Sequence, residues 1–261
     1  MQTLLNTFNR AWAAFIFFTR LPLWRIHQPP AEAYQSVVEW WPLVGWLTAS
    51  ATAATLFFCS MILPYAVAVG LAIVVRILLT GALHEDGLAD FCDGFGGGGN
   101  DRERILAIMK DSHIGTYGVL ALVLYMLLLF ACLHSMQPVH GALAILAFDP
   151  YAKMLSAQAV RMLPYARNEQ TAKAHVVYRK YGLAAGIGLA VQGLLPLGLF
   201  LWFMGETVNW STLILVPALV MYLLYLFIHR RLGGYTGDCC GALFLIIELS
   251  AYLALASMLG A

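Results

Sequence analysis

Seven long apolar segments run along this chain, and they restrict it to folds in which most helices meet lipid. They cover about residues 41–63, 65–83, 115–135, 140–163, 181–204, 210–229 and 239–259. Each is close to the roughly 20 residues with which an α-helix crosses a bilayer. Of the 261 residues, 61% are hydrophobic and 11% are charged, whereas about 25% of an average soluble domain is charged. The sequence therefore predicts an all-α, polytopic membrane helix bundle with about seven spans, forming a single domain over residues 1–261.

The distribution of basic residues supports this number of spans. The connections 63–65, 135–140 and 205–210 contain no Lys or Arg. The basic residues of the remaining connections are Arg10, Arg20, Arg25, Arg102, Arg104, Lys110, Arg167, Lys173, Arg179, Lys180, Arg230 and Arg231. They fall in four regions, the N-terminal stretch and the connections 84–114, 164–180 and 230–238. Cytoplasmic loops carry the excess of Lys and Arg, so we expect all four regions on the cytoplasmic side. Residues 3–20 resemble an amphipathic helix that lies at the membrane interface.

Net charge and cysteine usage exclude two other classes of protein. The formal net charge is +1, which gives no reason to expect a nucleic-acid partner. The five cysteines show no CxxC spacing and are odd in number. They indicate reduced, packed thiols rather than a disulfide framework or a zinc site.

Charged residues inside the apolar segments need a partner or a polar cavity. Asp149 and Lys153 are four residues apart, so they share a helix face and can pair. This pair either neutralises itself inside the bundle or belongs to a functional site. Arg76 either extends to the interface or pairs with Glu248.

The densest group of reactive side chains lies in residues 84–94. Asp86, Asp90 and Asp93 stand at positions i, i+4 and i+7, which places three carboxylates on one helix face. Three such charges repel one another unless a cation lies among them, and oxygen ligands favour Mg²⁺, Mn²⁺ or Ca²⁺. The spacing predicts a metal site. The alternative is a solvated acidic loop.

Two further polar clusters follow on the same side of the predicted topology. Residues 96–99 are four glycines, typical of a flexible linker, and a short helix is expected after Asp101. The second cluster is residues 233–238, whose glycines suit a tight turn. His84 and His113 are candidates for a general base or a phosphate contact, because imidazole titrates near neutral pH. Either can equally be a hydrogen-bonded structural histidine, with Asp111 or Asp238 as the base.

Several motifs together resemble one known family. They are HEDGLADFCDG at 84–94, RER at 102–104, IMKDSHIGTYG at 108–118, PYAR at 164–167, GGYTGD at 233–238 and FFTRLP at 17–22. In this order, over nearly the whole chain, they are similar to adenosylcobinamide-GDP ribazoletransferase, also called cobalamin synthase. The resemblance implies a Mg²⁺-dependent enzyme of the bacterial inner membrane, with its active site facing the cytoplasm. It would join adenosylcobinamide-GDP to α-ribazole or α-ribazole 5′-phosphate and release GMP, late in cobalamin biosynthesis.

The resemblance also implies roles for individual residues. The metal ligands and catalytic carboxylates would be Asp86, Asp90, Asp93 and Asp111, with His84 as a further catalytic residue. The substrate-binding residues would be Lys110, His113, Lys153, Arg167, Thr236 and Asp238. Two positions depart from the family pattern. Glu85 stands where an apolar residue is common. Lys153 stands where arginine is frequent, and lysine lacks the guanidinium that donates two parallel hydrogen bonds to one phosphate.

Two other functions compete with this interpretation. A CDP-alcohol phosphotransferase would share the metal chemistry, but its signature places Ala-Arg two residues after Asp-Gly, and no arginine follows Gly87 here. A secondary transporter would show inverted repeats and broken helices. We find no internal repeat, and the carboxylates gather at one face. The sequence leaves open whether the chain forms a homo-oligomer.

Overall fold

The computed structural model describes residues 2–167 and 177–259, and almost all of them are helical. The elements in chain order are α1 (Gln2–Phe18), η1 (Leu23–Arg25), η2 (Ala31–Trp40), α2 (Trp41–Ser60), α3 (Tyr65–Thr80), α4 (Leu83–Gly97), α5 (Arg102–Lys110), α6 (Thr116–His134), α7 (Pro138–Met162), α8 (Leu183–Met204), η4 (Gly205–Thr207), α9 (Trp210–Leu232) and α10 (Gly237–Leu259). The described residues contain no β-strand. They contain one isolated bridge, between Tyr165 and Tyr235. The predicted all-α class is confirmed.

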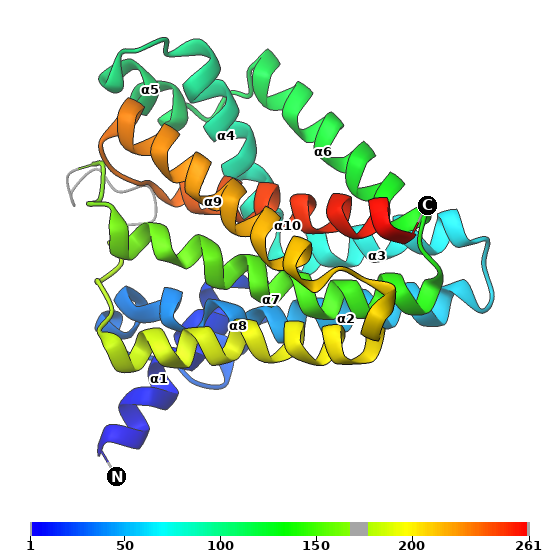
Figure 1. The fold of residues 1–261 in the computed structure, drawn as a ribbon. Coiled ribbons are helices and arrows are strands. Elements are labelled where there is room, and N and C mark those ends of the chain that lie inside the picture. Colours follow the sequence, from blue (N-terminus) through cyan, green and yellow to red (C-terminus); the bar gives the residue numbers. More distant parts are fainter. Residues whose placement is uncertain (1, 168–176, 260–261) are drawn as a thin grey trace.

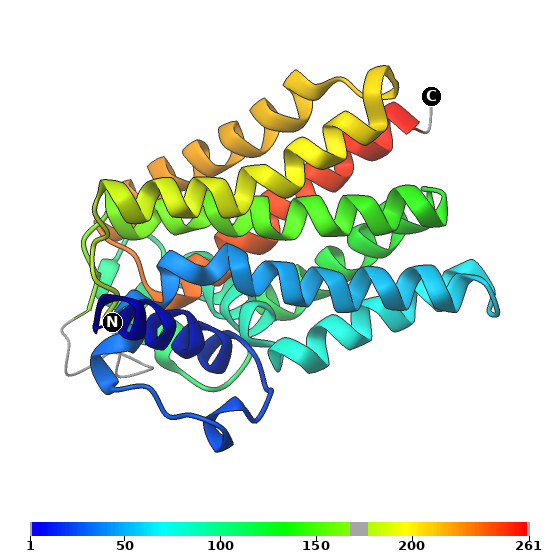
Figure 2. The same ribbon diagram turned by 90° about the horizontal axis from the view of Figure 1, so that it is seen from below.

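The long helices form a bundle around α7 and α10 (Figure 1). α10 packs against α4, α6, α7 and α9, and α7 also packs against α2 and α8. Figures 1 and 2 show that the α2–α3, α6–α7 and α8–α9 connections and the C-terminus lie at one end of the bundle. α4, α5 and the α9–α10 turn lie at the opposite end, which we call the acidic end. The connections that carry the basic residues therefore lie at this same acidic end, as the alternation of basic and bare connections in the sequence predicts.

Five helical segments are long and apolar enough to cross a membrane. The number becomes six if α3 and α4 together count as one broken span. The predicted count of seven is not confirmed among the described residues. α7 has 25 residues but carries Asp149, Lys153 and Arg161, and α3 has only 16 residues. The length of α7 predicts a membrane span, but its polar side chains make it an interior helix.

The outer helices expose apolar side chains in the way expected of a lipid-facing surface. Leu127 on α6 is 60% exposed, Trp202 on α8 is 83% exposed and Leu219 on α9 is 56% exposed. A fold that met water on these faces would leave this apolar area hydrated. The bundle is therefore a multi-pass membrane protein.

The N-terminal helix has the predicted amphipathic character. Leu4 and Phe8 on α1 are exposed, whereas Ala13, Ala14 and Phe18 are buried against the bundle. The helix therefore presents an apolar face outward at its start and packs inward at its end.

A sharp break between α3 and α4 sets the direction of the acidic segment. Gly81 and Ala82 both adopt left-handed backbone conformations, with φ of 65° and 57°, and the two helices are bent by 88°. The left-handed φ at position 81 favours glycine, and an added Cβ there would displace the side chain of Arg20. The break turns α4 across the acidic end instead of letting it continue along α3.

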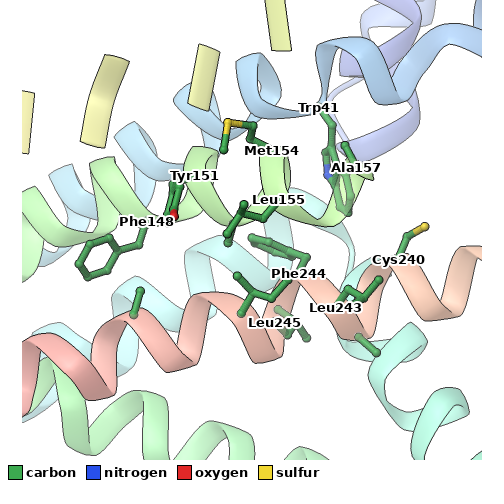
Figure 3. Packing of buried hydrophobic residues seen from close by; sticks show 14 of the residues in the cluster. Trp41, Phe148, Tyr151, Met154, Leu155, Ala157, Cys240, Leu243, Phe244 and Leu245 are labelled. Carbon is green, nitrogen blue, oxygen red and sulfur yellow. The ribbon is translucent and has the colours of Figure 1, made fainter. Parts of the chain in front are cut away.

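The centre of the bundle is an apolar layer between α7 and α10. Figure 3 shows Leu155 of α7 beside Phe244 of α10, with Leu245 following Phe244, and with Tyr151 and Phe148 one and two turns earlier along α7. All five side chains are buried. Buried side chains pack closely with few voids, so the shapes of these residues determine how α7 and α10 cross.

Buried charges in this interior are paired with one another. Lys153 pairs with Asp149 one turn earlier, and its Nζ lies 3.1 Å from Thr48 Oγ1. Arg76 donates to Glu248 Oε2 at 2.7 Å and to the Tyr125 hydroxyl at 2.8 Å. Both pairings foreseen from the sequence are confirmed, and Arg76 does not extend to the interface. The five cysteines are free thiols, as predicted.

Candidate active site

A pocket of about 190 Å³ lies at the acidic end, where α4 and α10 begin. Its aromatic wall comes from Phe17, Phe18, Trp41, Tyr165 and Tyr178. Its polar lining comes from His84, Asp86, Arg167, Thr236 and Asp238. The pocket thus joins five of the residues that the sequence nominated, although they come from three separate motifs.

Close contact between α4 and α10 brings the first of these motifs to the third. A Cβ added to Gly87 would lie 3.2 Å from the Cα of Asp238, and one added to Gly241 would lie 3.2 Å from the carbonyl oxygen of His84. Both contacts are tighter than ordinary van der Waals contact, so a larger residue at either position would push the two backbones apart. The close packing of α4 against α10 places Asp86 and Asp238 on the same pocket.

The segment that carries Arg167 is held by backbone pairing. Ala166 N–H donates to the Tyr235 carbonyl at 2.8 Å, and Tyr235 N–H donates to the Pro164 carbonyl at 2.9 Å. Arg102 of α5 strengthens this pairing, because its guanidinium donates to the carbonyls of Ala166 at 2.6 Å and Leu232 at 2.8 Å. The PYAR and GGYTGD motifs therefore form one unit.

The charged groups of the described lining are one guanidinium and two carboxylates, which leaves one excess negative charge. Arg167 Nη2 lies 3.8 Å from Asp238 Oδ2, and both side chains are largely buried. Thr236 Oγ1 lies 3.4 Å from the same carboxylate oxygen and accepts from Cys239 N–H at 3.2 Å. Burial raises the pKa of Tyr165 and of Tyr235, so neither phenol, neutral at pH 7 in any case, adds charge to the pocket. Arg167 is therefore the cation that the described lining offers to an anionic group.

His84 lies against aromatic rings and is 2% exposed. Its ring centroid lies 5.7 Å from that of Trp41 at 21° between planes, and 4.8 Å from that of Phe244 in an edge contact. Neither ring nitrogen has a hydrogen-bond partner among the described residues. A hydrogen bond from His84 to another described side chain or backbone group is therefore absent, and its alternative role as a structural histidine stays untested. Its role as base or phosphate contact stays a prediction.

The three carboxylates of α4 lie on the predicted helix, but they do not share one environment. Asp86 is exposed and lines the pocket, Asp90 is half-buried, and Asp93 is 7% exposed. Asp93 accepts from Gly115 N–H at 2.7 Å and Gly118 N–H at 2.9 Å. It therefore caps the start of α6. The glycine linker expected from 96–99 is shorter than predicted, because α4 continues to Gly97.

The other nominated residues lie elsewhere in the structure. Lys110, Asp111 and His113 are exposed around the α5–α6 connection and do not line the pocket. Asp111 Oδ1 accepts from the backbone and the ring of His113, which lowers the pKa of Asp111. Lys153 lies in the bundle interior with Asp149. Their contacts to a substrate or a metal stay predictions.

No group of three His, Cys, Asp or Glu side chains within 2–167 and 177–259 is arranged to hold a metal ion by itself. Mg²⁺ rarely relies on such a group, because it usually takes one or two carboxylates and completes its shell with water and substrate phosphate. Asp86 and Asp238 on one pocket fit this donor set. The assignment of Asp86, Asp90, Asp93 and Asp111 as a metal-ligand set stays a prediction.

Asp93→Asn tests whether Asp93 acts mainly as a helix cap. An asparagine keeps one acceptor oxygen and turns an N–H₂ group toward the other backbone N–H. We expect a loss of about 1.5–3 kcal/mol in unfolding free energy, the range for hydrogen bonds to a charged group. Thermal unfolding in detergent measures it, with the exposed Asp111→Asn as the control. An unchanged melting temperature together with lost turnover would instead assign Asp93 a direct chemical role.

The aromatic wall was not predicted from the sequence. Trp41, Tyr165 and Tyr178 are far apart in the chain, and aromatic residues are common in membrane helices, so no spacing marks them. Phe17 and Phe18 carried a signal, because they open the FFTRLP motif.

Comparison with known proteins shows the family of this chain. The sequence model of the family described as Cobalamin-5-phosphate synthase matches residues 10–256. An adenosylcobinamide-GDP ribazoletransferase of Leptothrix cholodnii is 36% identical, with 97% of each chain covered. Proteins of the same name from Leptospira interrogans (31% identical, 97% of each chain) and Shewanella baltica (35% identical, 92% of this chain and 90% of the relative) also match. No solved structure matches the chain. The chain therefore belongs to the cobalamin-5-phosphate synthase family, whose members named adenosylcobinamide-GDP ribazoletransferase are transferases of cobalamin synthesis.

Proposed function

We propose that this chain joins adenosylcobinamide-GDP to α-ribazole or α-ribazole 5′-phosphate and releases GMP. The observation that carries the proposal is the convergence of Asp86, Asp238 and the buried Arg167 on one pocket, in a chain of this family. A diphosphate needs a cation for its oxygens, and its reaction needs carboxylates for metal and proton. The pocket supplies both.

The reaction is a displacement at phosphorus. A ribose hydroxyl of α-ribazole attacks the phosphorus that bears the cobinamide, and a new P–O bond forms. The bond from that phosphorus to the bridging oxygen breaks, and GMP leaves with the bridging oxygen. The hydroxyl proton passes to a carboxylate of the pocket. Arg167 binds the phosphate oxygens, and its burial keeps competing water away.

We propose Mg²⁺ as the cofactor, held by Asp86 and Asp238. When bound, Mg²⁺ neutralises the charge that develops on the diphosphate oxygens. The chain contributes orientation, because the Gly87–Gly241 contact fixes both carboxylates relative to the pocket.

A turnover assay in detergent or liposomes tests the proposal. It combines adenosylcobinamide-GDP with α-ribazole and follows GMP and the cobamide product, with and without Mg²⁺. We expect equal amounts of both products, and loss of both when EDTA removes the metal and return when Mg²⁺ is restored. A parallel reaction with a CDP-alcohol lipid substrate should give no product. Turnover of that lipid alone would overturn the proposal.

We also propose that the protein lies in the bacterial inner membrane with the acidic end in the cytoplasm. The support is that the basic connections lie at that end, and such loops stay in the cytoplasm. Single cysteines placed at Arg104 and at Glu206, in a variant whose native cysteines are replaced, test the orientation. We expect a membrane-impermeant thiol reagent applied from outside to label position 206 and not position 104. The reverse pattern would invert the topology.

A further inference from the structure

Buried polar atoms without a partner are concentrated at the pocket. Within the described residues, seven buried side-chain nitrogen or oxygen atoms lack a hydrogen-bond partner. Four of the seven belong to pocket-lining residues, namely Trp41 Nε1, both ring nitrogens of His84 and Arg167 Nε. Buried polar groups are almost always hydrogen-bonded. The concentration of exceptions here shows that these polar groups take their partners from what fills the pocket, which makes them available to a ligand.

Three nearly parallel rings line one side of this pocket, and their centroids form a triangle, because Phe18 also lies 6.3 Å from His84 at 14° between planes. Phe18 and Trp41 have ring centroids 5.1 Å apart and planes 12° apart. Trp41 and His84 follow at 5.7 Å and 21°. Trp41 and His84 are both almost fully buried. Such a wall favours a flat aromatic ligand, which stacks or packs edge-on against it.

The pocket is open at one side, and its enclosed part has the size of one small ring system. A cavity of about 150 Å³ holds a benzene molecule, whereas pockets for drug-sized ligands occupy about 300–1,000 Å³. At about 190 Å³ this pocket has room for one small heteroaromatic group. A corrin macrocycle is far larger and must lie outside it.

Under the proposed function, two flat groups are candidates, the guanine of the GDP moiety and the base of α-ribazole. Guanine carries several donors and acceptors along its edge, and each would need a partner when buried. The two carboxylates of the described lining, Asp86 and Asp238, are both engaged by the metal under the proposed function, so guanine would have no carboxylate for that edge. The benzimidazole of α-ribazole is apolar except for one free ring nitrogen, which accepts one hydrogen bond.

We propose, on the basis of the proposed function, that the Phe18–Trp41–His84 wall binds the base of α-ribazole. Its free ring nitrogen accepts a hydrogen bond from a buried N–H of His84 or Trp41. The ribose then extends toward Asp86 and Asp238 on the same pocket, where its hydroxyl reacts. The guanosine and corrin portions of the other substrate lie outside this wall. Trp41 and His84 thus determine which lower-ligand base is accepted.

Variants of neighbouring tryptophans test this assignment. Trp40 and Trp41 both have a buried indole nitrogen without a partner, but only Trp41 lines the pocket. Trp41→Phe and His84→Phe each keep a flat ring but remove the N–H donor of that side chain. His84→Gln provides an N–H donor again without the ring. We expect the KM for α-ribazole to rise about tenfold or more in both Phe variants, with the KM for adenosylcobinamide-GDP unchanged. Trp40→Phe should change neither, and His84→Gln should recover part of the loss.

Measurements on the unaltered protein keep the proposal testable if a variant does not fold. Free benzimidazole should inhibit competitively against α-ribazole. Competition against adenosylcobinamide-GDP instead, or a raised KM for that substrate in Trp41→Phe, would assign the wall to guanine and overturn the proposal. Unchanged KM values in both Phe variants would also overturn it. If direct binding of α-ribazole depends on Trp41 while no cobamide forms, the inference stands and the proposed function fails.

Discussion

Asp86→Asn is expected to lower the rate of GMP release on the order of 10²–10³-fold, with little change in melting temperature. Asp86 is exposed on the pocket, so its replacement by an isosteric amide leaves no buried charge. The substitution removes a full negative charge from the place where the metal and the diphosphate are proposed to meet. Losing one electrostatic contact to a transition state commonly costs a factor of this size. The turnover assay at saturating substrate measures it, together with the Mg²⁺ dependence.

Two other carboxylates serve as comparisons for Asp86. Glu103→Gln removes an exposed charge from α5 outside the pocket and should leave turnover unchanged. Asp111→Asn should reduce turnover less than Asp86→Asn, because Asp111 is exposed and bonded to His113. If Asp111→Asn is as damaging as Asp86→Asn, the α5–α6 connection contributes to the reaction and the site extends beyond the pocket. Full turnover by Asp86→Asn at low Mg²⁺ would remove Asp86 from the mechanism.

Arg76→Met is expected to destabilise the protein by about 3–5 kcal/mol, the cost of removing one partner of a buried ion pair. Arg76 is 6% exposed and connects four helices. It hydrogen-bonds Glu248 of α10 and Tyr125 of α6, and it lies 4.0 Å from Glu85 of α4. The variant leaves Glu248 buried without its cation. Thermal unfolding in detergent, followed by circular dichroism, measures the loss.

A half-exposed arginine and a double variant serve as controls for Arg76. Arg10 is 38% exposed and lies 3.8 Å from the buried Glu39, which has a second cation, Arg179, at 3.9 Å. Arg10→Met should therefore cost less than Arg76→Met, about 1 kcal/mol. Arg76→Met combined with Glu248→Met should recover more than half of the loss, because an apolar pair can replace a buried ion pair. Full recovery is not expected, since Glu85 keeps its charge. A single variant as stable as the unaltered protein would show that Arg76 does not hold the helices together.

Much of this architecture follows from local sequence. An apolar stretch of about 20 residues becomes a long helix whatever its neighbours are, and the boundaries of α6, α9 and α10 lie close to those predicted. The i, i+4, i+7 spacing of Asp86, Asp90 and Asp93 is likewise a property of one helix. The motifs 84–94, 164–167 and 233–238 were also expected on one side, because the basic loops alternate with bare turns.

Only the tertiary structure decided how these motifs meet. The sequence does not show that Gly81 and Ala82 turn α4 by 88°, because a left-handed pair of residues is stabilised by what packs around it. It does not separate Asp86 in the pocket from Asp93 at the cap of α6, because their local surroundings read alike. Nor does it join Trp41 to His84, or Arg167 to Asp238. Such contacts depend on which helices cross and how closely, and here glycines on two distant helices set that distance. The sequence thus determined the helices and their chemistry, and the packing of those helices determined the site.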